Sequence, residues 1–157
     1  SNILKMKKLV LILVILFLSN CGFTPIYNNQ ENIGFEILIE KIDGDKSINN
    51  ILEKKLKRYS NNETGKIYII NVQTTFNKDI LSKDKTGRAT DLKLSTNVNF
   101  TVKYENQIKE FSFNENLNID SSSNFYEQNN YENDIKNNFV NTIVDKLIVK
   151  LKLIKWL

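Results

Sequence analysis

Residues 91–104 alternate between apolar and polar side chains without a break, which predicts a long strand with one buried face and one polar face. Such a strand needs neighbours, and the same period of two recurs in residues 34–42, in residues 66–76 and after a turn at 105–107. The last of these segments carries Phe111, Phe113, Leu117 and Ile119 on one face. Glu115 interrupts that face, so we expect an edge position or a bulge there.

Two other segments have apolar residues at helical spacing. In residues 46–59 the apolar stripe consists of Ile48, Ile51, Leu52, Leu56 and Tyr59. Either Asp45 or Ser47 can cap the start of this helix. In residues 128–154 the stripe consists of Tyr131, Ile135, Phe139, Ile143, Leu147, Leu151 and Ile154, and Val140, Val144 and Ile148 widen it. Residues 77–90 and 121–130 are predicted to be polar connections, the first of which contains Lys78, Lys83, Lys85 and Arg88.

The order of elements is therefore strand, helix, strand, strand, strand, helix. The helix between the first two strands allows them to be parallel with a right-handed crossover, whereas the shorter later links favour antiparallel neighbours. Each helix has one apolar stripe and each strand one apolar face, so we expect an α+β fold: a two-layer sandwich with two helices on one face of a four-stranded mixed sheet. The other face is predicted to be polar and to carry Glu36, Glu40, Lys93, Asn97, Asn99, Lys103, Asn114 and Asn118.

The N-terminal segment has the layout of an export signal. Lys5, Lys7 and Lys8 precede an apolar run over residues 9–18, which is about half the length that a bilayer core requires. The run ends in Leu18-Ser19-Asn20-Cys21-Gly22, which resembles a bacterial lipobox with a lipidated Cys21. An uncleaved anchor, or an ordinary signal with an incidental thiol, is the alternative. We expect a signal peptide at 1–20, a lipidated tether at 21–33 and one domain at 34–157.

The composition argues against several functional classes. The chain has no His and one Cys, which excludes a Ser-His-Asp triad, a Cys–His pair, an internal disulfide and the common Cys/His zinc sites. No Gly-rich phosphate loop occurs. Removal of the signal takes away three Lys and leaves 19 basic against 18 acidic side chains, so a nucleic-acid partner is not expected. We therefore expect neither an enzyme nor a cofactor or metal.

Several short motifs point to a family. The chain contains Cys-Gly-Phe-x-Pro-x-Tyr at 21–27, Thr86-Gly87-Arg88 ahead of the alternating strand, and Phe125-Tyr126 and Tyr131-Glu132-x-Asp134 near the start of the long helix. Their order resembles the lipopolysaccharide-assembly lipoprotein LptE family of alphaproteobacterial type. The resemblance implies a lipid-anchored protein on the periplasmic side of the outer membrane. Such a protein plugs the LptD β-barrel, assists its assembly, and takes part in lipopolysaccharide transport to the cell surface.

The resemblance also directs attention to the basic residues. Binding of lipopolysaccharide requires cations that face phosphate and sugar-acid groups. In the family, basic residues of the loop before the alternating strand are implicated, and Lys83, Lys85 and Arg88 are the candidates here, with Lys78 in the same predicted loop. The family also uses a basic residue before the last helix, whereas residues 121–134 contain no Lys or Arg.

Three alternatives stay open at this point. A sheet wetted on one side is ordinary, so the polar face can be plain solvent-exposed surface. The basic loop can likewise be a solvated connection. An accessory lipoprotein of a different transport or cell-envelope complex would share the anchor and the fold class, and the identity of a co-purified partner would distinguish it from an LptE-like protein.

Overall fold

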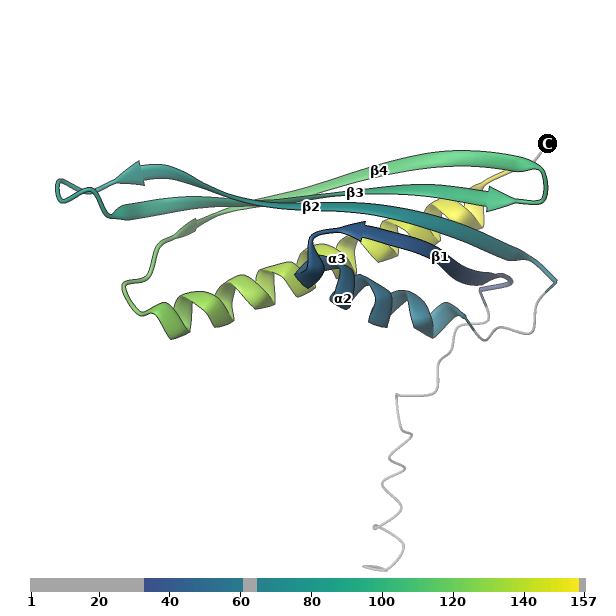
Figure 1. Cartoon of the computed structure of the whole chain (residues 1–157), viewed down its shortest axis with the longest axis horizontal. Helices are drawn as coiled ribbons and strands as arrows, with labels where there is room; N and C mark the ends of the chain where they lie inside the picture. Colours follow the sequence, from purple (N-terminus) through teal and green to yellow (C-terminus); the bar gives the residue numbers. More distant parts are fainter. Residues whose placement is uncertain (1–32, 61–64, 156–157) are drawn as a thin grey trace, which may run out of the picture. The chain divides into compact units, whose positions relative to one another are not determined.

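The computed structural model describes residues 33–60 and 65–155, so the predicted signal at 1–20, and residues 21–32 of the predicted tether with Cys21, lie outside the described residues; Ile33 is described and is buried in the core. The elements within this part are β1 (Glu36–Gly44), α2 (Lys46–Leu56), the 3-10 turn η2 (Lys57–Tyr59), β2 (Ile67–Lys83), β3 (Ala89–Tyr104), β4 (Gln107–Asp120) and α3 (Phe125–Leu153) (Figure 1). The predicted order of strands and helices is confirmed.

The four strands form one sheet in the order β1-β2-β3-β4. β1 and β2 are parallel, because α2 carries the chain back between them, and the other neighbours are antiparallel. Both helices lie on the same face of the sheet (Figure 1). The predicted α+β class, with two helices on one face of a mixed sheet, is therefore confirmed.

The first strand runs two residues further than predicted, to Gly44, and it contains a bulge. Ile39 pairs with Ile70 and Lys41 with Asn71, which leaves Glu40 as the extra residue. The strand then ends at Gly44, where φ is +109° and a Cβ atom would lie 1.9 Å from the carbonyl oxygen of Thr74. Only glycine fits this position.

The first helix, α2, begins with one of the two N-caps that the sequence predicts. The side chain of Asp45 accepts a hydrogen bond from the backbone N–H of Ile48 at 2.9 Å, so Asp45 rather than Ser47 is the cap. Ile48, Leu52 and Leu56 are buried, as their spacing predicts.

The connection predicted at residues 77–90 is wrong. β2 continues to Lys83 and β3 begins at Ala89, so only residues 84–88 form the turn of a long hairpin. The pairing continues regularly from Phe76 with Thr96 to Ile80 with Leu92. The strand periodicity fades in this part of β2 because Lys78 and Ile80 occupy core-facing register positions but remain exposed.

We define two ends of the domain along the strands. The proximal end contains the beginning of β1, the turn at Glu105 and Asn106, and the end of α3: Glu36 pairs with Ile67, and the Nζ atom of Lys109 donates to the carbonyl oxygen of Lys155 at 2.8 Å. The distal end contains the hairpin turn at 84–88 and the loop at 121–124. These names are used below.

The buried core consists of two clusters. The larger one lies toward the proximal end and joins β1, both helices, β2 and β3; Leu52, Ile70, Phe100 and Leu147 are among its members. The smaller one lies toward the distal end and consists of Leu92, Leu94, Ile119, Ile135 and Phe139. The distal half therefore has much less apolar packing beneath the sheet.

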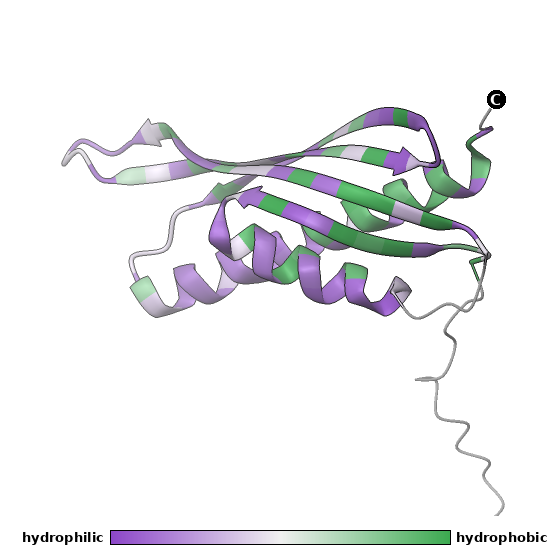
Figure 2. Cartoon of the chain, turned by 45° about the vertical axis from the view of Figure 1, so that its right-hand side comes forward, coloured by the Kyte–Doolittle hydropathy of each residue, from purple (hydrophilic) through white to green (hydrophobic). Residues whose placement is uncertain are grey.

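The face of the sheet that the helices leave uncovered is polar over most of its area, as expected. We call it the helix-free face, and Figure 2 shows hydrophilic and hydrophobic residues alternating along the strands. The prediction fails near the proximal end, where Leu38, Ile67, Ile69 and Ile108 occupy the helix-free face with 39–61% of their surfaces exposed. Leu38 pairs with Ile69 in neighbouring strands, so these apolar residues are partly clustered.

Glu115 lies on the edge strand β4, and the pairing of β4 with β3 shows no register shift. The expected edge position is confirmed and the bulge is not found. Glu115 faces the helix layer, where its carboxylate accepts a hydrogen bond from the Nζ atom of Lys146 on α3. An ion pair, rather than a change of register, accommodates this charge.

The last helix starts at Phe125, three residues before the predicted start. Asn124 caps it by accepting hydrogen bonds from the backbone N–H groups of Tyr126 (3.0 Å) and Glu127 (3.3 Å). Tyr131 was expected in the buried stripe but is half exposed, and the polar Gln128 and Glu132 are buried instead.

Candidate functional site

The hairpin turn at the distal end carries the three basic residues predicted to bind lipopolysaccharide. Lys83 is the last residue of β2, and Lys85 and Arg88 lie in the turn itself; all three side chains are exposed. Lys78 does not belong to this group, because it lies inside β2 and its Nζ atom donates to Glu132 of α3. The structure thus brings three of the four cations of the predicted loop to one tip.

Asp84 holds the turn in shape. Its Oδ1 atom accepts hydrogen bonds from the backbone N–H of Thr86 (2.8 Å), the Thr86 hydroxyl (2.6 Å) and the backbone N–H of Arg88 (3.0 Å). Gly87 follows with φ of +83°, a conformation that favours glycine. The hydrogen bonds from the Thr86 side chain and the Arg88 backbone keep the pKa of Asp84 below its ordinary value. The turn is therefore preorganised by a carboxylate that stays ionised.

Arg88 lies beside this carboxylate and still faces solvent. Its Nε atom donates to Oδ2 of Asp84 at 3.2 Å and to the hydroxyl oxygen of Thr86 at 3.1 Å, while 76% of its side chain is exposed. The terminal nitrogens of the guanidinium make none of these contacts. Within the described part of the chain, neither Lys83 nor Lys85 forms an ion pair. The tip therefore offers cationic donors to an external anion.

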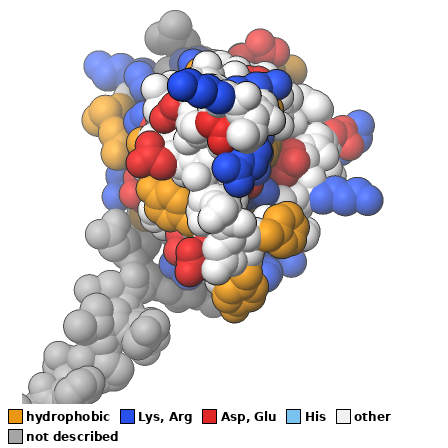
Figure 3. All heavy atoms as spheres, turned by 90° about the vertical axis from the view of Figure 1, so that its left-hand side faces the viewer, with side chains coloured by type: hydrophobic (Ala, Val, Ile, Leu, Met, Phe, Trp, Pro, Cys, Tyr) orange, Lys and Arg blue, Asp and Glu red, His pale blue; other side chains and the backbone are white. Residues whose placement is uncertain are grey.

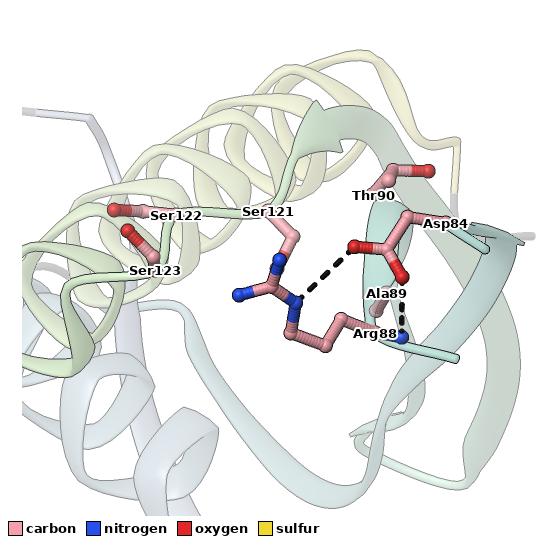
Figure 4. Close-up of a pocket in the computed structure, with 7 residues that line it drawn as sticks. All are labelled: Asp84, Arg88, Ala89, Thr90, Ser121, Ser122 and Ser123. Carbon is pink, nitrogen blue, oxygen red and sulfur yellow. Dashed lines mark hydrogen bonds and ion pairs between the residues drawn. The ribbon is translucent and has the colours of Figure 1, made fainter. Parts of the chain in front are cut away.

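A cleft of about 580 Å³ lies between the hairpin tip and the loop that precedes α3. Figure 4 shows the Arg88 side chain extending between Asp84 on one side and the serine loop on the other. The lining residues are Asp84, Arg88, Ala89, Thr90, Ser121, Ser122 and Ser123. The loop side of the cleft thus presents three consecutive serines.

The far wall of the cleft is held by hydrogen bonds. The backbone N–H of Ser121 donates to the carbonyl oxygen of Thr90 at 2.7 Å, and that of Ser122 donates to Oε1 of Gln128 at 2.7 Å. Gln128 in turn donates through Nε2 to Glu132 at 2.8 Å. Burial raises the pKa of Glu132, but the hydrogen bonds from Lys78 and Gln128 outweigh this effect and keep the pKa below its ordinary value. The serine loop is thereby linked to β2 through a buried polar chain.

Apolar side chains are also exposed in the distal half of the domain. Phe125 and Tyr126, in the first turn of α3, are 79% and 73% exposed, and Ile80, Leu81 and Tyr131 are about half exposed. Figure 3, which views the molecule from the left-hand side of Figure 1, shows hydrophobic side chains interspersed with Lys, Arg, Asp and Glu on this end. Exposed aromatic residues beside exposed cations suit a ligand that is both anionic and apolar.

The sequence did not lead us to expect two parts of this site. The serine loop lacks any charge or periodicity to mark it, and Phe125 and Tyr126 were expected in a polar loop at 121–130, not in the first turn of the last helix. The Asn124 cap, followed by Glu127, was the available signal for the earlier start. No group of acidic or Cys side chains suited to a metal ion occurs among residues 33–60 and 65–155.

The architecture is similar to that of solved lipoprotein structures. No protein-family profile matches the chain, and no curated protein sequence matches it. Among solved structures, rare lipoprotein B from Shewanella oneidensis matches with a TM-score of 0.51 at 10% identity, over 70% of this chain and 95% of that one. The domain has the fold of rare lipoprotein B. Rare lipoprotein B is the LptE protein, so the resemblance to the LptE family is confirmed at the level of the fold.

Two further structures align over similar lengths. A minor lipoprotein from Acinetobacter baumannii aligns at 11% identity and a TM-score of 0.48, over 73% of this chain and 93% of that one. A lipoprotein B from Nitrosomonas europaea aligns at 16% identity and a TM-score of 0.46, over 75% of this chain and 83% of that one. Neither helix of the described domain is long and apolar enough to cross a membrane.

Proposed function

We propose that this chain is an outer-membrane lipoprotein that is anchored through Cys21, plugs an LptD β-barrel and assists its assembly, and takes part in lipopolysaccharide transport. The observation that carries the proposal is the helix-free face: a long, mostly polar sheet surface that neither helix of the described residues covers, in a domain with the rare lipoprotein B fold. A large polar surface fits a partner with a wet, polar interior, such as the lumen of a large outer-membrane barrel.

The polar groups of the helix-free face support this role. Glu40 accepts hydrogen bonds from the Nζ atom of Lys103 at 2.8 Å and from Nδ2 of Asn71 at 2.9 Å, which fixes three strands to one another on this face. These two bonds hold the pKa of Glu40 below its ordinary value, the bond from Lys103 contributing most. The neighbouring residues of β3 and β4 are mainly Asn, Ser and Thr, which present hydrogen-bonding groups without a strong net charge.

The distal end supplies the lipopolysaccharide contact in this proposal. Lys83, Lys85 and Arg88 would face phosphate and sugar-acid groups, since Arg offers a forked pair of donors and Lys a point charge. The exposed Phe125 and Tyr126 would contact the apolar part of the same lipid. The three serines of the cleft would donate hydrogen bonds to sugar or phosphate oxygens where the family uses a cation.

Affinity purification of the full chain from outer membranes tests the proposal. We expect a large β-barrel to co-purify, to be identified as LptD by mass, and mass spectrometry to find acyl chains on Cys21. An unmodified Cys21 thiol would end the lipoprotein assignment. Recovery of a soluble periplasmic or inner-membrane partner instead of a barrel would favour an accessory lipoprotein of another envelope complex.

A further inference from the structure

Exposed cations gather at the proximal end, where both helices finish. The sequence of α2 ends with a basic stretch that continues into η2, and α3 also carries Lys residues in its last turn. Lys66 lies at the same end, next to the start of β1, since its carbonyl oxygen accepts a hydrogen bond from the backbone N–H of Glu36 at 2.8 Å. The exposed cations of this group, which we call the proximal basic group, are Lys54, Lys57, Arg58, Lys66, Lys150 and Lys152, with the partly exposed Lys55 beside them.

Acidic side chains neutralise this group only in part, although Asp145 lines the same pocket as Lys55 and Arg58, and Glu36 lies beside Lys66. Lys57 pairs with Glu53 at 3.0 Å, but within residues 33–60 and 65–155 no ion pair forms at Lys55, Arg58, Lys66 or Lys150. The helix dipoles favour cations in the last turn of each helix. They do not account for Lys66, which precedes a strand. The proximal basic group therefore retains positive charge that can attract an anionic surface.

Aliphatic side chains lie among these cations. Val149 and Leu153, which flank Lys150 along α3, are 53% and 74% exposed. Ile67 follows Lys66, and Ile108 stands beside the turn at Glu105 and Asn106, also exposed. Cations that can reach phosphates, mixed with aliphatic side chains that can enter the headgroup layer, are typical of surfaces that lie on a bilayer.

The chain connects the proposed anchor to this same end. The described domain begins at Ile33, next to the start of β1. Cys21 lies twelve residues earlier, so the connection can span at most about 40 Å. Along the chain, the proposed acyl chains are thus joined to the domain at the end where β1 begins.

We propose that, while the domain is outside a barrel, its proximal end rests on the anionic phospholipid headgroups of the leaflet that holds the acyl chains of Cys21. This inference rests on the proposed lipid anchor and adds a second, electrostatic membrane contact. The contact would orient the domain with its distal end, and the candidate lipopolysaccharide site, pointing away from the leaflet. The charge of the group and its aliphatic neighbours favour phospholipid over a protein surface.

The test places the acylated full chain in vesicles of phosphatidylethanolamine, with or without phosphatidylglycerol. Because Cys21 is the single Cys and is blocked by acylation, Asn106→Cys offers one free thiol at the proximal end and Ser123→Cys one at the distal end. Energy transfer from a dye on each thiol to a headgroup-labelled lipid reports proximity to the bilayer. We expect strong transfer from residue 106, which requires phosphatidylglycerol and is lost near 1 M salt, and weak transfer from residue 123.

Two charge-matched variants sharpen the test. Lys55→Gln/Arg58→Gln/Lys150→Gln should lower the ratio of docked to undocked protein about fivefold per cation, on the order of a hundredfold in all. Lys83→Gln/Lys85→Gln/Arg88→Gln removes the same charge at the distal end and should leave the ratio unchanged. Transfer that is independent of phosphatidylglycerol, or equal losses in the two variants, would overturn the inference.

Failure of the anchor can be told apart from failure of the inference. If the Cys21 thiol reacts with maleimide, the lipoprotein assignment is wrong. The same chain, with its thiols blocked, is then sedimented with the two kinds of vesicle. Binding that depends on phosphatidylglycerol and is lost at high salt would still support the basic surface, whereas binding equal in both vesicles would overturn it.

Discussion

The proximal and distal halves of this domain are built differently. In the proximal half, four strands and two helices enclose the larger core, in which Ile48, Leu52, Ile70 and Leu147 have no exposed surface. In the distal half, three strands and the first half of α3 enclose a core of five residues, and a buried polar chain takes the place of further apolar packing. The difference separates a half with a large apolar core from an extension with a small core and exposed aromatic residues.

The largest expected effect concerns core truncation. Leu52→Ala should lower the free energy of unfolding by about 3 kcal/mol, because it leaves a cavity among buried neighbours of α2, α3 and the sheet. Leu92→Ala should cost about 2 kcal/mol, because its smaller cluster lies near solvent and can relax. Urea denaturation of the two variants measures both values. An equal or larger loss for Leu92→Ala would show that the two halves do not differ in this way.

The next largest loss of stability is expected in the polar chain of the distal half, in which Glu132 accepts hydrogen bonds from Gln128 and Lys78. Glu132→Ala should cost about 2 kcal/mol, because Gln128 loses a buried acceptor while Lys78, whose side chain is 42% exposed, can turn to water. Lys146→Ala is a suitable comparison, because the pair of Lys146 with Glu115 is more exposed and should be worth less than 1 kcal/mol. A cost for Glu132→Ala no greater than that for Lys146→Ala would contradict the buried role.

The same residue gives a pH dependence. The pKa of Glu132 is lower in the folded chain than its ordinary value, so its stabilising contribution is complete above about pH 5 and is lost as the pH falls through the folded-state pKa. Glu132→Gln should therefore flatten the decline of stability in acid. Thermal unfolding of the wild type and the variant, followed from neutral pH downward, measures this. Parallel curves would mean that Glu132 titrates as it does in the unfolded chain.

A smaller free-energy change is expected at the proposed lipopolysaccharide site. Lys85→Ala/Arg88→Ala should weaken binding of lipopolysaccharide about tenfold or more while changing stability by less than about 0.5 kcal/mol, since both side chains are exposed. Lys54→Ala/Lys55→Ala removes the same charge at the proximal end and should leave this affinity nearly unchanged. A direct binding assay at moderate salt measures both, and unchanged affinity in the distal variant would refute the site.

The smallest stability effect is expected at the aromatic residues of the distal end. Phe125→Ser/Tyr126→Ser should change the free energy of unfolding by less than about 0.5 kcal/mol, because both rings face solvent. Lipopolysaccharide affinity should nevertheless fall severalfold if the rings contact acyl chains. A large loss of stability would show that these rings belong to the core of the distal half.

The contrast between the halves also explains which parts of the structure the sequence could predict. Where one face is buried on both strands and helices, as in residues 91–104 and 46–56, the period of apolar residues gives the element, its face and its neighbours. The distal half lacks such a period of apolar residues in β2. Residues 77–83 extend beyond β1 and α2 and none of them is buried, so their pattern predicts a loop where the structure has a strand.

The candidate site, too, could be predicted from the sequence only in part. Lys83, Lys85 and Arg88 were identifiable as cations near a glycine, and the structure brings them to one tip. The cleft opposite them depends on the hydrogen bonds from Ser121 to Thr90 and from Ser122 to Gln128, which join residues far apart in the chain. Alternation along β1 and β2 already places Leu38, Ile67 and Ile69 on the face opposite the buried Ile37, Tyr68 and Ile70, but the predicted polar face did not include them; the register then shows that Leu38 and Ile69 are neighbours.

The central claim is that the helix-free face lies against the inside of a barrel, and site-specific crosslinking tests it most directly. A photoreactive residue replaces Asn99, which is exposed on the helix-free face, or Asn138, which is exposed on α3. In intact cells we predict that position 99 gives an adduct with LptD and that position 138 gives a weaker one. No barrel adduct at position 99, or an adduct there with a soluble periplasmic protein alone, would contradict the account.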